Sequence, residues 1–495
     1  MSDPNTDAAY VADLENAIEK IWAIARRMGL DPYPVNFELV PATIMYEFGS
    51  YGLPGRFSHW SRGKAYYRMK TEYDYGLSKI YELVVNTNPS YAFLMEQNDI
   101  LQNKVVVAHV LGHTDMFKNN IYFKHTPPNM IDKVSVNADR IRKYEFEHGT
   151  AKVERFLDAV LAIDEHIDPN FQLKRAQAAA QGKPASKEKA ERPGGAEAPD
   201  TFEDLLGPDA RAAKRAEEER AAKRRHKFPT EPEKDLLLFF AEHAPSLEDW
   251  QRDILLIVRE EMQYFVPQMQ TKVLNEGWAS LTHARIMREM DLPDADYAAF
   301  AQMHSGVLAA SRTHMNPYLL GYRILEDIER RWDNPTEEER IKLGRVPGQG
   351  RAKIFEVRET ESDVSLLRNY LTKDLIEDLD LYLYAKEDDE WVIVEKDWEK
   401  VRDGIVASMT NFGYPYITIE DADFNRNSEL LLKHHFERYE LDVKYAQKTL
   451  EYVYAIWSRP VHLDTVFEER PVRMSYDGED HDSNFVETSP GEIPF

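Results

Sequence analysis

A polar, low-complexity segment at residues 172–230 constrains the fold more than any other feature of the sequence. Ala, Lys, Arg, Glu and Gln dominate this segment, and no large apolar residue lies between Pro184 and Ala198. A segment of this composition cannot bury enough apolar surface to fold by itself. The two parts of the chain on either side must therefore supply the folded core.

Helical periodicity dominates both flanks of this segment. Val11, Leu14, Ile18 and Ile21 recur at three- and four-residue spacing, which predicts a helix over residues 9–29. The other helical patterns lie at residues 64–86, 98–168 and 234–332, and a short strand is predicted at 91–97. These patterns predict a body that is mostly helical.

The patterns change after a Gly-rich break around residues 346–350. The sequence LDLYLYAKEDDEWVIVEK predicts two β-runs joined by a turn, and further strand and helix patterns follow it. We therefore predict an α+β fold, in which a large, mostly helical N-terminal body precedes a small α+β domain with an antiparallel sheet. The predicted parts are 9–171 and 231–345 for the helical body, 172–230 for the charged insertion, 351–470 for the α+β domain, and 471–495 for an acidic, disordered tail.

Charge and composition exclude several classes of function. The chain has 87 acidic and 62 basic residues, a net charge of −25, which disfavours binding to nucleic acid or to an anionic membrane. It contains no cysteine, so disulfides, thiolate nucleophiles and cysteine metal ligands are absent. No apolar run approaches the roughly 20 residues that span a bilayer, and the acidic N-terminus does not resemble a signal peptide. We expect a cytoplasmic protein with no nucleic acid or membrane partner.

The clearest chemical motif is a histidine pair at positions 109 and 113. Residues four apart share one face of a helix, with Cβ atoms about 5 to 6 Å apart, so His109 and His113 can hold one ion. The spacing resembles that of the H-E-x-x-H helix of zinc peptidases, but Val110 stands where that motif carries its general base. A hydrogen-bonded pair without an ion is the alternative.

A second motif could complete such a site. Glu276 and His283 are seven residues apart, two turns along one helix face, and Gly277 permits close packing beside them. Two histidines from one helix and one carboxylate from another form a common catalytic zinc site. We expect Glu276 to be a ligand and His283 to be a fourth ligand or a group that contacts the transition state. The alternative for Glu276 is a favourable interaction with a helix dipole.

A third motif is acidic. Glu145 and His148 form the Glu-x-x-His pair that di-iron carboxylate bundles use, although the chain has no second copy of it. A site with two metal ions remains open, with His148 as a further ligand, and a helix C-terminal cap is the alternative for His148. Glu145 or Asp115 could supply the general base that Val110 cannot.

Several long strings resemble one protein family. They are MYEFGSYGLPGRFSHW, KAYYRMKTEYDYGLSKIYELV, AHVLGHTDMFKNN, YEFEHGTAKVERFLDA, WQRDILLIVREEMQYFVPQMQTKVLNEGWAS and KTLEYVYAIWSRPVHLDTV. They are similar to the stage V sporulation protein R (SpoVR) family from about residue 10 to 467. The resemblance implies a bacterial cytoplasmic protein and, in spore formers, a link to formation of the peptidoglycan cortex. The family often reads Glu-Gly-Trp-Ala-Ser-Tyr-Trp-His, whereas Leu281 and Thr282 stand here in place of the two aromatic residues.

Two classes of function remain open at this point. One is a metal-dependent hydrolase, with zinc as the expected ion, that cuts an amide bond in a peptide or a cell-wall-related substrate. The other is a regulatory or scaffolding protein that binds a protein partner and carries a structural metal or none. An open coordination position would favour the enzyme, and a closed shell of four ligands would favour the scaffold.

The polar segment generates the first prediction. Replacing residues 175–230 with a short Gly/Ser linker should leave the fold intact, because this segment contributes little apolar surface to the core. Thermal unfolding of the shortened protein measures this directly. A fall in the midpoint of more than about 8 °C, a loss of a few kcal/mol, would contradict it.

Overall fold

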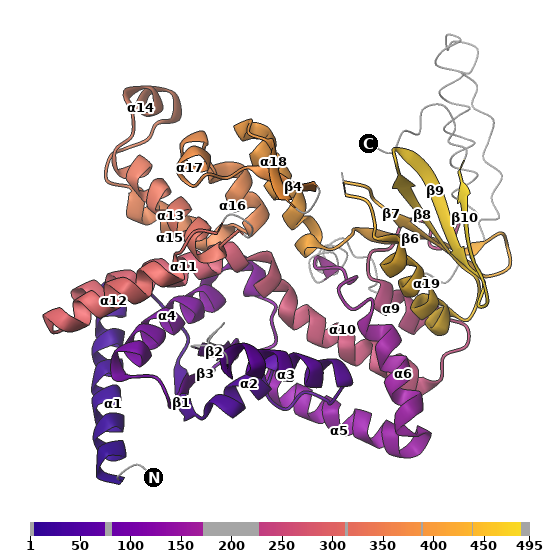
Figure 1. Cartoon of the computed structure of the whole chain (residues 1–495), viewed down its shortest axis with the longest axis horizontal. Coiled ribbons are helices and arrows are strands. Elements are labelled where there is room, and N and C mark those ends of the chain that lie inside the picture. Colours follow the sequence, from indigo (N-terminus) through magenta and orange to yellow (C-terminus); the bar gives the residue numbers. More distant parts are fainter. Residues whose placement is uncertain are drawn as a thin grey trace, which may run out of the picture. The chain divides into compact units, whose positions relative to one another are not determined.

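The computed structural model describes residues 4–74, 82–171, 227–311, 315–387, 390–437 and 439–486. The chain forms two compact units, and each unit combines two separate stretches of sequence (Figure 1). The first unit contains Met1–Lys143 and Tyr264–Gly413, and the second contains Tyr144–Gln263 and Tyr414–Phe495. The predicted insertion lies outside the described residues as far as residue 226.

The first unit is mostly helical, as the sequence predicts. Its helices are α1 (Pro4–Arg27), α2 (Ala42–Tyr51), α3 (Trp60–Asp74), α4 (Ile100–Asn119), η1 (Ile121–Phe123), α11 (Lys272–Glu289), α12 (Asp294–Val307), α13 (Pro317–Asp333), α14 (Glu337–Leu343), α15 (Gly350–Thr360), α16 (Asp363–Tyr370), α17 (Lys373–Asp378), α18 (Trp398–Met409) and η3 (Thr410–Gly413). Helices α5 (Met130–His148) and α10 (Asp249–Gln270) contribute residues to both units. No helix in the described ranges is both long enough and apolar enough to cross a membrane.

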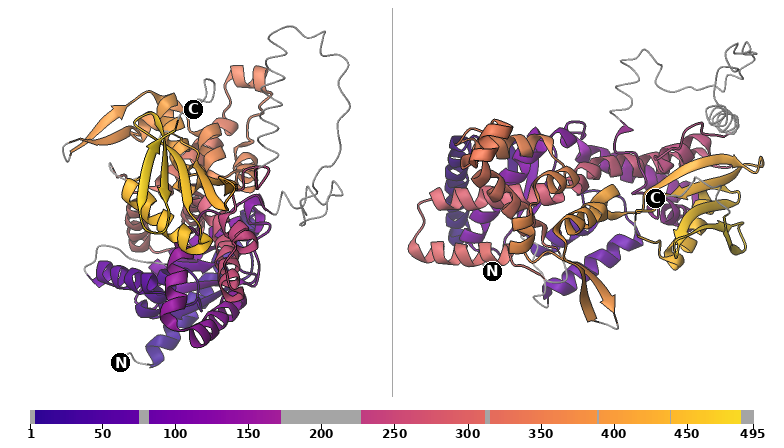
Figure 2. Two further views of the ribbon diagram at one scale, coloured as in Figure 1. Left: turned by 90° about the vertical axis from the view of Figure 1, so that its right-hand side faces the viewer. Right: turned by 90° about the horizontal axis from the view of Figure 1, so that it is seen from above.

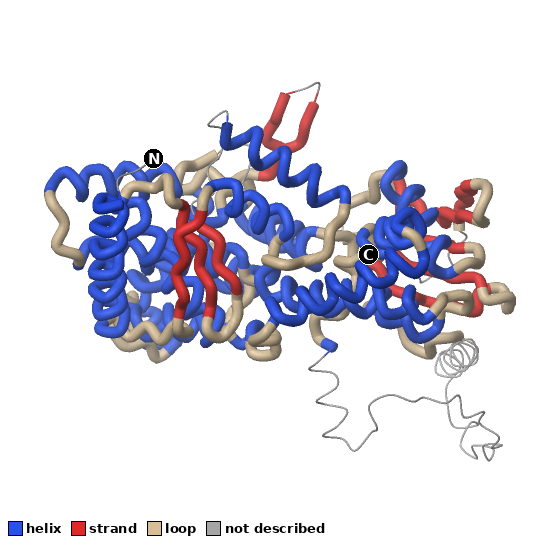
Figure 3. Tube along the Cα trace, turned by 90° about the horizontal axis from the view of Figure 1, so that it is seen from below, coloured by secondary structure: helices blue, strands red, loops and turns tan. Residues whose placement is uncertain are grey.

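A three-stranded sheet in the first unit contains β1 (Val35–Val40), β2 (Glu82–Val85) and β3 (Ser90–Met95) (Figure 3). The central strand β3 pairs parallel with β1 and antiparallel with β2. The strand predicted at 91–97 is therefore confirmed, but the helix predicted over 64–86 is wrong at its C-terminal end. Residues 82–85 are Glu-Leu-Val-Val, and pairing with β3 favours an extended chain there.

Helix α4 lies at the centre of this unit and packs against α11, which in turn packs against α13 (Figure 1). Asp99 and Gln102 form a capping box that satisfies backbone N–H groups at the start of α4. Beyond this first turn, almost every side chain of α4 from Val106 to Phe117 is buried. A helix that is buried on all sides must satisfy its polar side chains within the protein.

Residues 351–413 belong to the first unit, although the sequence predicts that they begin the C-terminal domain. Ile354, Val357, Leu366 and Val401 from helices α15, α16 and α18 are all buried in the same core as α4 and α11. These helices belong to the first unit because each of them buries an apolar face in its core. The predicted β-hairpin, β4 (Leu383–Glu387) with β5 (Glu390–Glu395), is confirmed and extends away from these helices (Figures 2 and 3).

The second unit contains a five-stranded sheet with the order β10-β9-β8-β7-β6 (Figure 1). Its elements are α6 (Thr150–Leu161), α9 (Leu236–His243), β6 (Ile417–Phe424), β7 (Glu429–His434), α19 (Val443–Trp457), β8 (Val461–Phe467), β9 (Arg470–Tyr476) and β10 (His481–Phe485). The α+β class is confirmed. The sheet is mixed, because β7 and β8 pair parallel and α19 makes the crossover between them.

The sheet also includes two stretches that the sequence assigns elsewhere. Strands β9 and β10 lie in the predicted tail at 471–495, where buried Val472 and Met474 alternate with more exposed residues. At the other edge of the sheet, the segment that follows the insertion pairs with β6. Ala422 N–H donates a hydrogen bond to Phe228 O, and Glu233 pairs with Ile419. A deletion of the insertion should therefore end at residue 226.

Close packing of α11 on α13 leads to a second prediction. A Cβ added to Gly277 would lie 2.3 Å from the carbonyl carbon of Gly321. Gly277→Ala should therefore lower the free energy of unfolding by about 3 kcal/mol, because two packed backbones would have to separate. Chemical denaturation measures the effect.

The matched control for this substitution is Gly63→Ala in α3, where an added Cβ meets nothing within 4 Å. Gly63→Ala should be neutral or slightly stabilising, because Ala favours a helix over Gly by about 1 kcal/mol. Equal stability of the two variants would mean that the α11–α13 contact tolerates a side chain.

Candidate metal centre

Helix α4 places two imidazoles side by side. His109 and His113 are both buried, and their ring centroids are 4.6 Å apart. Val110 lies between them in the sequence but is completely buried in the core, as its apolar side chain requires. The predicted sharing of one helix face by His109 and His113 is confirmed.

The Nε2 atoms of both imidazoles face two carboxylates. His109 Nε2 lies 3.2 Å from Glu82 Oε1 and 3.6 Å from Glu276 Oε2. His113 Nε2 lies 3.5 Å from each of the same two oxygens. Ligands held at about 2.0 to 2.2 Å by one tetrahedral ion are roughly 3.3 to 3.6 Å apart. The four measured separations are close to that range.

The Nδ1 atoms point the other way, and each has a hydrogen-bond partner. His113 Nδ1 lies 2.9 Å from Asn275 Oδ1, and His109 Nδ1 lies 2.8 Å from His283 Nδ1. His283 Nε2 continues this chain to His304 Nδ1 at 2.9 Å. If each ring donates outward from Nδ1, the Nε2 lone pairs remain free. Metal-ligating imidazoles are held in this way by partners at the second nitrogen.

His283 therefore has a different place from the one that the sequence predicts. Its two ring nitrogens are engaged with His109 and His304, so it supports a candidate ligand and does not itself join the carboxylates. Burial and the neighbouring imidazoles hold the pKa of His283 well below its ordinary value. A neutral ring in this position can accept a hydrogen bond from His109 and donate one to His304.

The positions of the donor atoms are compatible with a bound metal ion. Glu82, His109 and His113 offer ligand atoms that all lie within 4.8 Å of one another. In addition, His109 Nε2 and Glu276 Oε2 are buried and have no hydrogen-bond partner. Buried polar atoms without partners are costly, and a cation between them would remove that cost. Two imidazoles and carboxylate oxygens are ligands that zinc prefers.

Electrostatics also couple these side chains. Burial by itself would raise the pKa of Glu276, but the imidazoles of His109 and His113 hold it below its ordinary value. Burial raises the pKa of the Tyr318 phenol, and so do the charges of Glu276 and Glu82 and a hydrogen bond to Glu276. Tyr318 therefore remains a neutral hydrogen-bond donor at the cluster.

The cluster opens into a cavity of about 1040 Å³. Strand β2, helices α4, α11 and α12, and the residues before α13 all contribute to its walls. The two carboxylates and three of the imidazoles, His109, His113 and His283, line it together. A small organic molecule can therefore reach the candidate ligands.

Asp115, predicted as a possible base, does not line this cavity. It lies two residues beyond His113, so its side chain leaves α4 on another face. Its carboxylate accepts hydrogen bonds from Trp278 Nε1 at 2.9 Å, Asp31 N–H at 2.8 Å and Arg358 Nη1 at 3.1 Å. A carboxylate that is saturated in this way has a structural role, because it joins α4 to α11 and α15.

Glu145 and His148 do not join the cluster either. Both belong to the second unit, and neither lines the cavity of the first. The His148 ring stacks on Trp250 with the ring centroids 4.9 Å apart. The interpretation of this pair as metal ligands or a base has no support from the cavity that contains His109.

Three members of the cluster, Glu82, Asn275 and His304, are not predicted from the sequence. Glu82 begins a short strand that the periodicity assigns to a helix, and nothing local marks it as a ligand. Asn275 directly precedes Glu276, so its position one residue before a predicted ligand is the available signal. His304 lies on α12, and only the packing of the helices brings it to His283.

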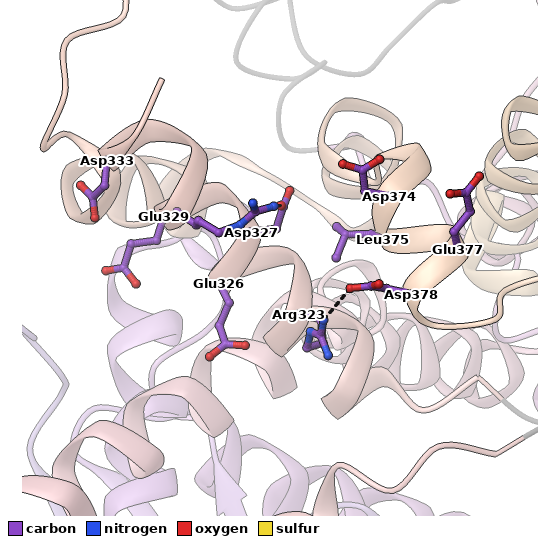
Figure 4. Close-up of a pocket in the computed structure, with 10 residues that line it drawn as sticks. Arg323, Glu326, Asp327, Glu329, Asp333, Asp374, Leu375, Glu377 and Asp378 are labelled. Carbon is purple, nitrogen blue, oxygen red and sulfur yellow. Dashed lines mark hydrogen bonds and ion pairs between the residues drawn. The ribbon is translucent and has the colours of Figure 1, made fainter. Parts of the chain in front are cut away.

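A second cavity, of about 770 Å³, lies between α13 and α17 in the same unit (Figure 4). Seven carboxylates and two arginines line it, and Arg323 pairs with Asp378 at 3.1 Å. Its lining residues include no imidazole and no nucleophile. We therefore assign the candidate chemistry to the cavity that contains the histidines.

The charge of His113 generates a prediction for the metal-free protein. Burial would lower the pKa of His113, but the hydrogen bond to Glu82 and the charge of Glu276 raise it from 6.5 to about 9. Because the folded-state pKa is the higher one, this group stabilises the fold fully below pH 6.5. That stabilisation, roughly 3 kcal/mol, should be lost as the pH rises through about 9.

Urea denaturation of chelator-treated protein at pH 6 and pH 9.5 measures this loss. Glu82→Gln removes the hydrogen-bonded carboxylate and should make the loss smaller. An equal loss of stability in the wild type and in Glu82→Gln would show that His113 does not carry the effect.

Comparisons with known proteins agree with this division only near residue 414, because the first family match also spans residues 144–263 of the second unit. The family described as SpoVR like protein matches residues 8–414, and the SpoVR-like C-terminal domain matches residues 415–468. The boundary between the two matches falls where the first unit ends, at Gly413.

Among curated proteins, the chain is similar to "Uncharacterized protein YcgB" of Escherichia coli (strain K12). The two are 28% identical over 487 residues, which cover 93% of each chain. No solved structure is significantly similar. Because the two family matches together cover nearly the whole sequence, the chain belongs to the SpoVR family.

Proposed function

We propose that this protein is a metal-dependent hydrolase whose ion is held by His109, His113 and Glu276. One observation carries the proposal: both Nε2 atoms converge on carboxylate oxygens at 3.2 to 3.6 Å, while both Nδ1 atoms are held by hydrogen bonds on the opposite side. This combination is typical of imidazoles that are arranged to bind a metal. Zinc is the expected ion, because nitrogen and carboxylate donors in fourfold geometry suit it.

Glu82 is the group that we assign to proton transfer. It contacts both imidazoles and lies at the cavity wall, where a water molecule has access. A bound divalent ion would polarise a carbonyl group and make a water molecule more acidic. Glu82 can then accept the proton of that water, which is the role that Val110 cannot fill. Tyr318, whose phenol donates a hydrogen bond to Glu276, can hold that carboxylate in place.

The proposed reaction is hydrolysis of an amide bond in a peptide or a cell-wall-related compound. A link to spore formation rests on the name of the family. The cavity has room for a short peptide beside the cluster, and pockets of this size bind small ligands.

A second function is favoured by one specific observation, the presence of two carboxylates at the cluster. If Glu82 and Glu276 both bind the ion with the two histidines, the shell of four ligands is closed. The ion would then be structural, and the protein would act as a scaffold for a partner. The role of Glu82 therefore separates the two proposals.

Metal content and activity in matched variants test this. Protein purified without an affinity tag should contain about one zinc per chain, and His113→Ala and Glu276→Gln should each lower that content tenfold or more. Glu82→Gln should keep the zinc and lose hydrolysis of N-acylated peptides. Glu326→Gln, in the acidic cavity of the same unit, should keep both.

Two results would count against the enzyme. Loss of zinc in Glu82→Gln would make Glu82 a fourth ligand and favour the structural site. Full metal content in His113→Ala would show that His113 does not hold the ion, and would rule out the proposed metal centre.

A further inference from the structure

We infer that the cavity selects amides with an apolar acyl group on one side of the scissile bond and a free carboxylate on the other. This inference rests on the proposed hydrolase function and adds a substrate class to it. It depends on how the cavity walls are ordered along α4 and α11, and on the charge of one lysine.

The two helices run antiparallel along the cavity, which gives it two distinct ends. His109 meets His283, whereas His113, further along α4, meets Asn275, which comes earlier on α11. Residues before His109 on α4 therefore lie toward one end. Residues before Asn275 on α11 lie toward the other end, with the candidate ligands between the two.

The first end is mainly apolar, although Gln102 also lines it. Val105 and Val106 precede His109 by about one turn of α4 and line the cavity there. Met303 and Val307 from α12 line the same end, because His304 between them is hydrogen-bonded to His283. These four side chains offer contact area to an alkyl or aromatic group and carry no charge.

The opposite end carries Lys272, which begins α11 one turn before Glu276. The two residues are four apart, so their Cβ atoms are about 5 to 6 Å apart on one helix face. Lys272 is the one lysine or arginine among the residues that line the described part of this cavity.

The place of this lysine in the helix is unfavourable by itself, because a cation in the first turn opposes the helix dipole. The backbone N–H groups of Val273 and Leu274 are already satisfied by Asp363, at 2.8 and 2.9 Å. The charge of His113 is balanced by Glu82 and Glu276. The Lys272 ammonium is therefore the cation at this end that can bind a carboxylate. Sites that break a local preference in this way are often functional.

A ligand of the inferred class matches this order of groups. Its acyl chain would contact Val105 and Met303, its amide carbonyl would lie at the cluster, and the carboxylate of its amine part would reach Lys272. In an N-acylamino acid, one carbon atom separates the amide nitrogen from the carboxylate. The carboxylate is then only a few bonds from the amide carbonyl, and the long, flexible side chain of Lys272 can span the remaining distance.

The reaction of such a ligand is balanced without any further reactant. Water adds its oxygen to the amide carbonyl carbon, and the C–N bond breaks. The acyl part leaves as a carboxylate, and the nitrogen takes the protons of the water to leave as the ammonium group of an amino acid. No electron acceptor or donor is required.

Ligand binding to metal-free protein tests the inference separately from catalysis. Isothermal titration calorimetry should give a dissociation constant for N-octanoylglycine at least tenfold lower than for N-octanoylglycinamide, which lacks the carboxylate. N-acetylglycine, which lacks the alkyl chain, should also bind at least tenfold more weakly.

Variants assign each preference to its residue. Lys272→Ala should remove the preference for the carboxylate and leave binding of N-octanoylglycinamide unchanged, whereas Lys272→Arg should keep it. Val105→Asn should weaken binding of N-octanoylglycine and leave N-acetylglycine unchanged. Circular dichroism confirms that each variant is folded.

The inference is overturned if wild-type protein binds the acid and the amide equally, or if Lys272→Ala weakens both to the same extent. Release of glycine from N-octanoylglycine by zinc-loaded protein is a separate measurement. Selective binding without glycine release would contradict the hydrolase and leave the ligand class in place. Equal hydrolysis of the acid and the amide would leave the hydrolase and contradict the ligand class.

Discussion

The close approach of α4 and α11 is the contact on which the rest of the first unit depends. A Cβ on Gly112 would lie 2.6 Å from Ala279 Cα, so the two backbones touch where the helices cross. At this separation, short side chains on either side of the crossing can meet. The imidazoles of α4 therefore reach Glu276, Asn275 and His283 directly. Larger residues at the crossing would separate the two halves of the cluster.

Two buried carboxylates away from the cluster hold these helices in register. Asp115 joins α4 to Trp278 of α11 and to Arg358 of α15, and Asp363 of α16 caps the start of α11. Burial raises the pKa of both carboxyls, and their hydrogen bonds act against that rise. Removing either carboxyl would leave buried donors without partners, which costs more than the hydrogen bonds themselves contribute. Both therefore fix the position of α11 relative to its neighbours.

The cluster itself is arranged in advance for a cation. Hydrogen bonds orient both imidazoles, and a chain of three histidines runs from His109 to the partly exposed His304. This arrangement leaves His109 Nε2 and Glu276 Oε2 buried and without hydrogen-bond partners. Burying polar atoms without partners costs free energy. This cost is reasonable at a functional site and unusual in a core that serves stability alone. The second cavity, whose walls are acidic, shows no comparable arrangement among its lining residues.

Local periodicity is enough to predict the helical body, the α+β class and the histidine pair. His109 and His113 share a face on any helix, and Gly277 signals close packing wherever α11 lies. Glu82 belongs to a strand that periodicity misassigns, and its contact with both imidazoles depends on the tertiary fold. The same is true of the hydrogen bonds that Trp278 and Arg358 donate to Asp115, and of the place of Glu145 in another unit. These outcomes depend on contacts between residues far apart in the chain, about which the local pattern contains no information.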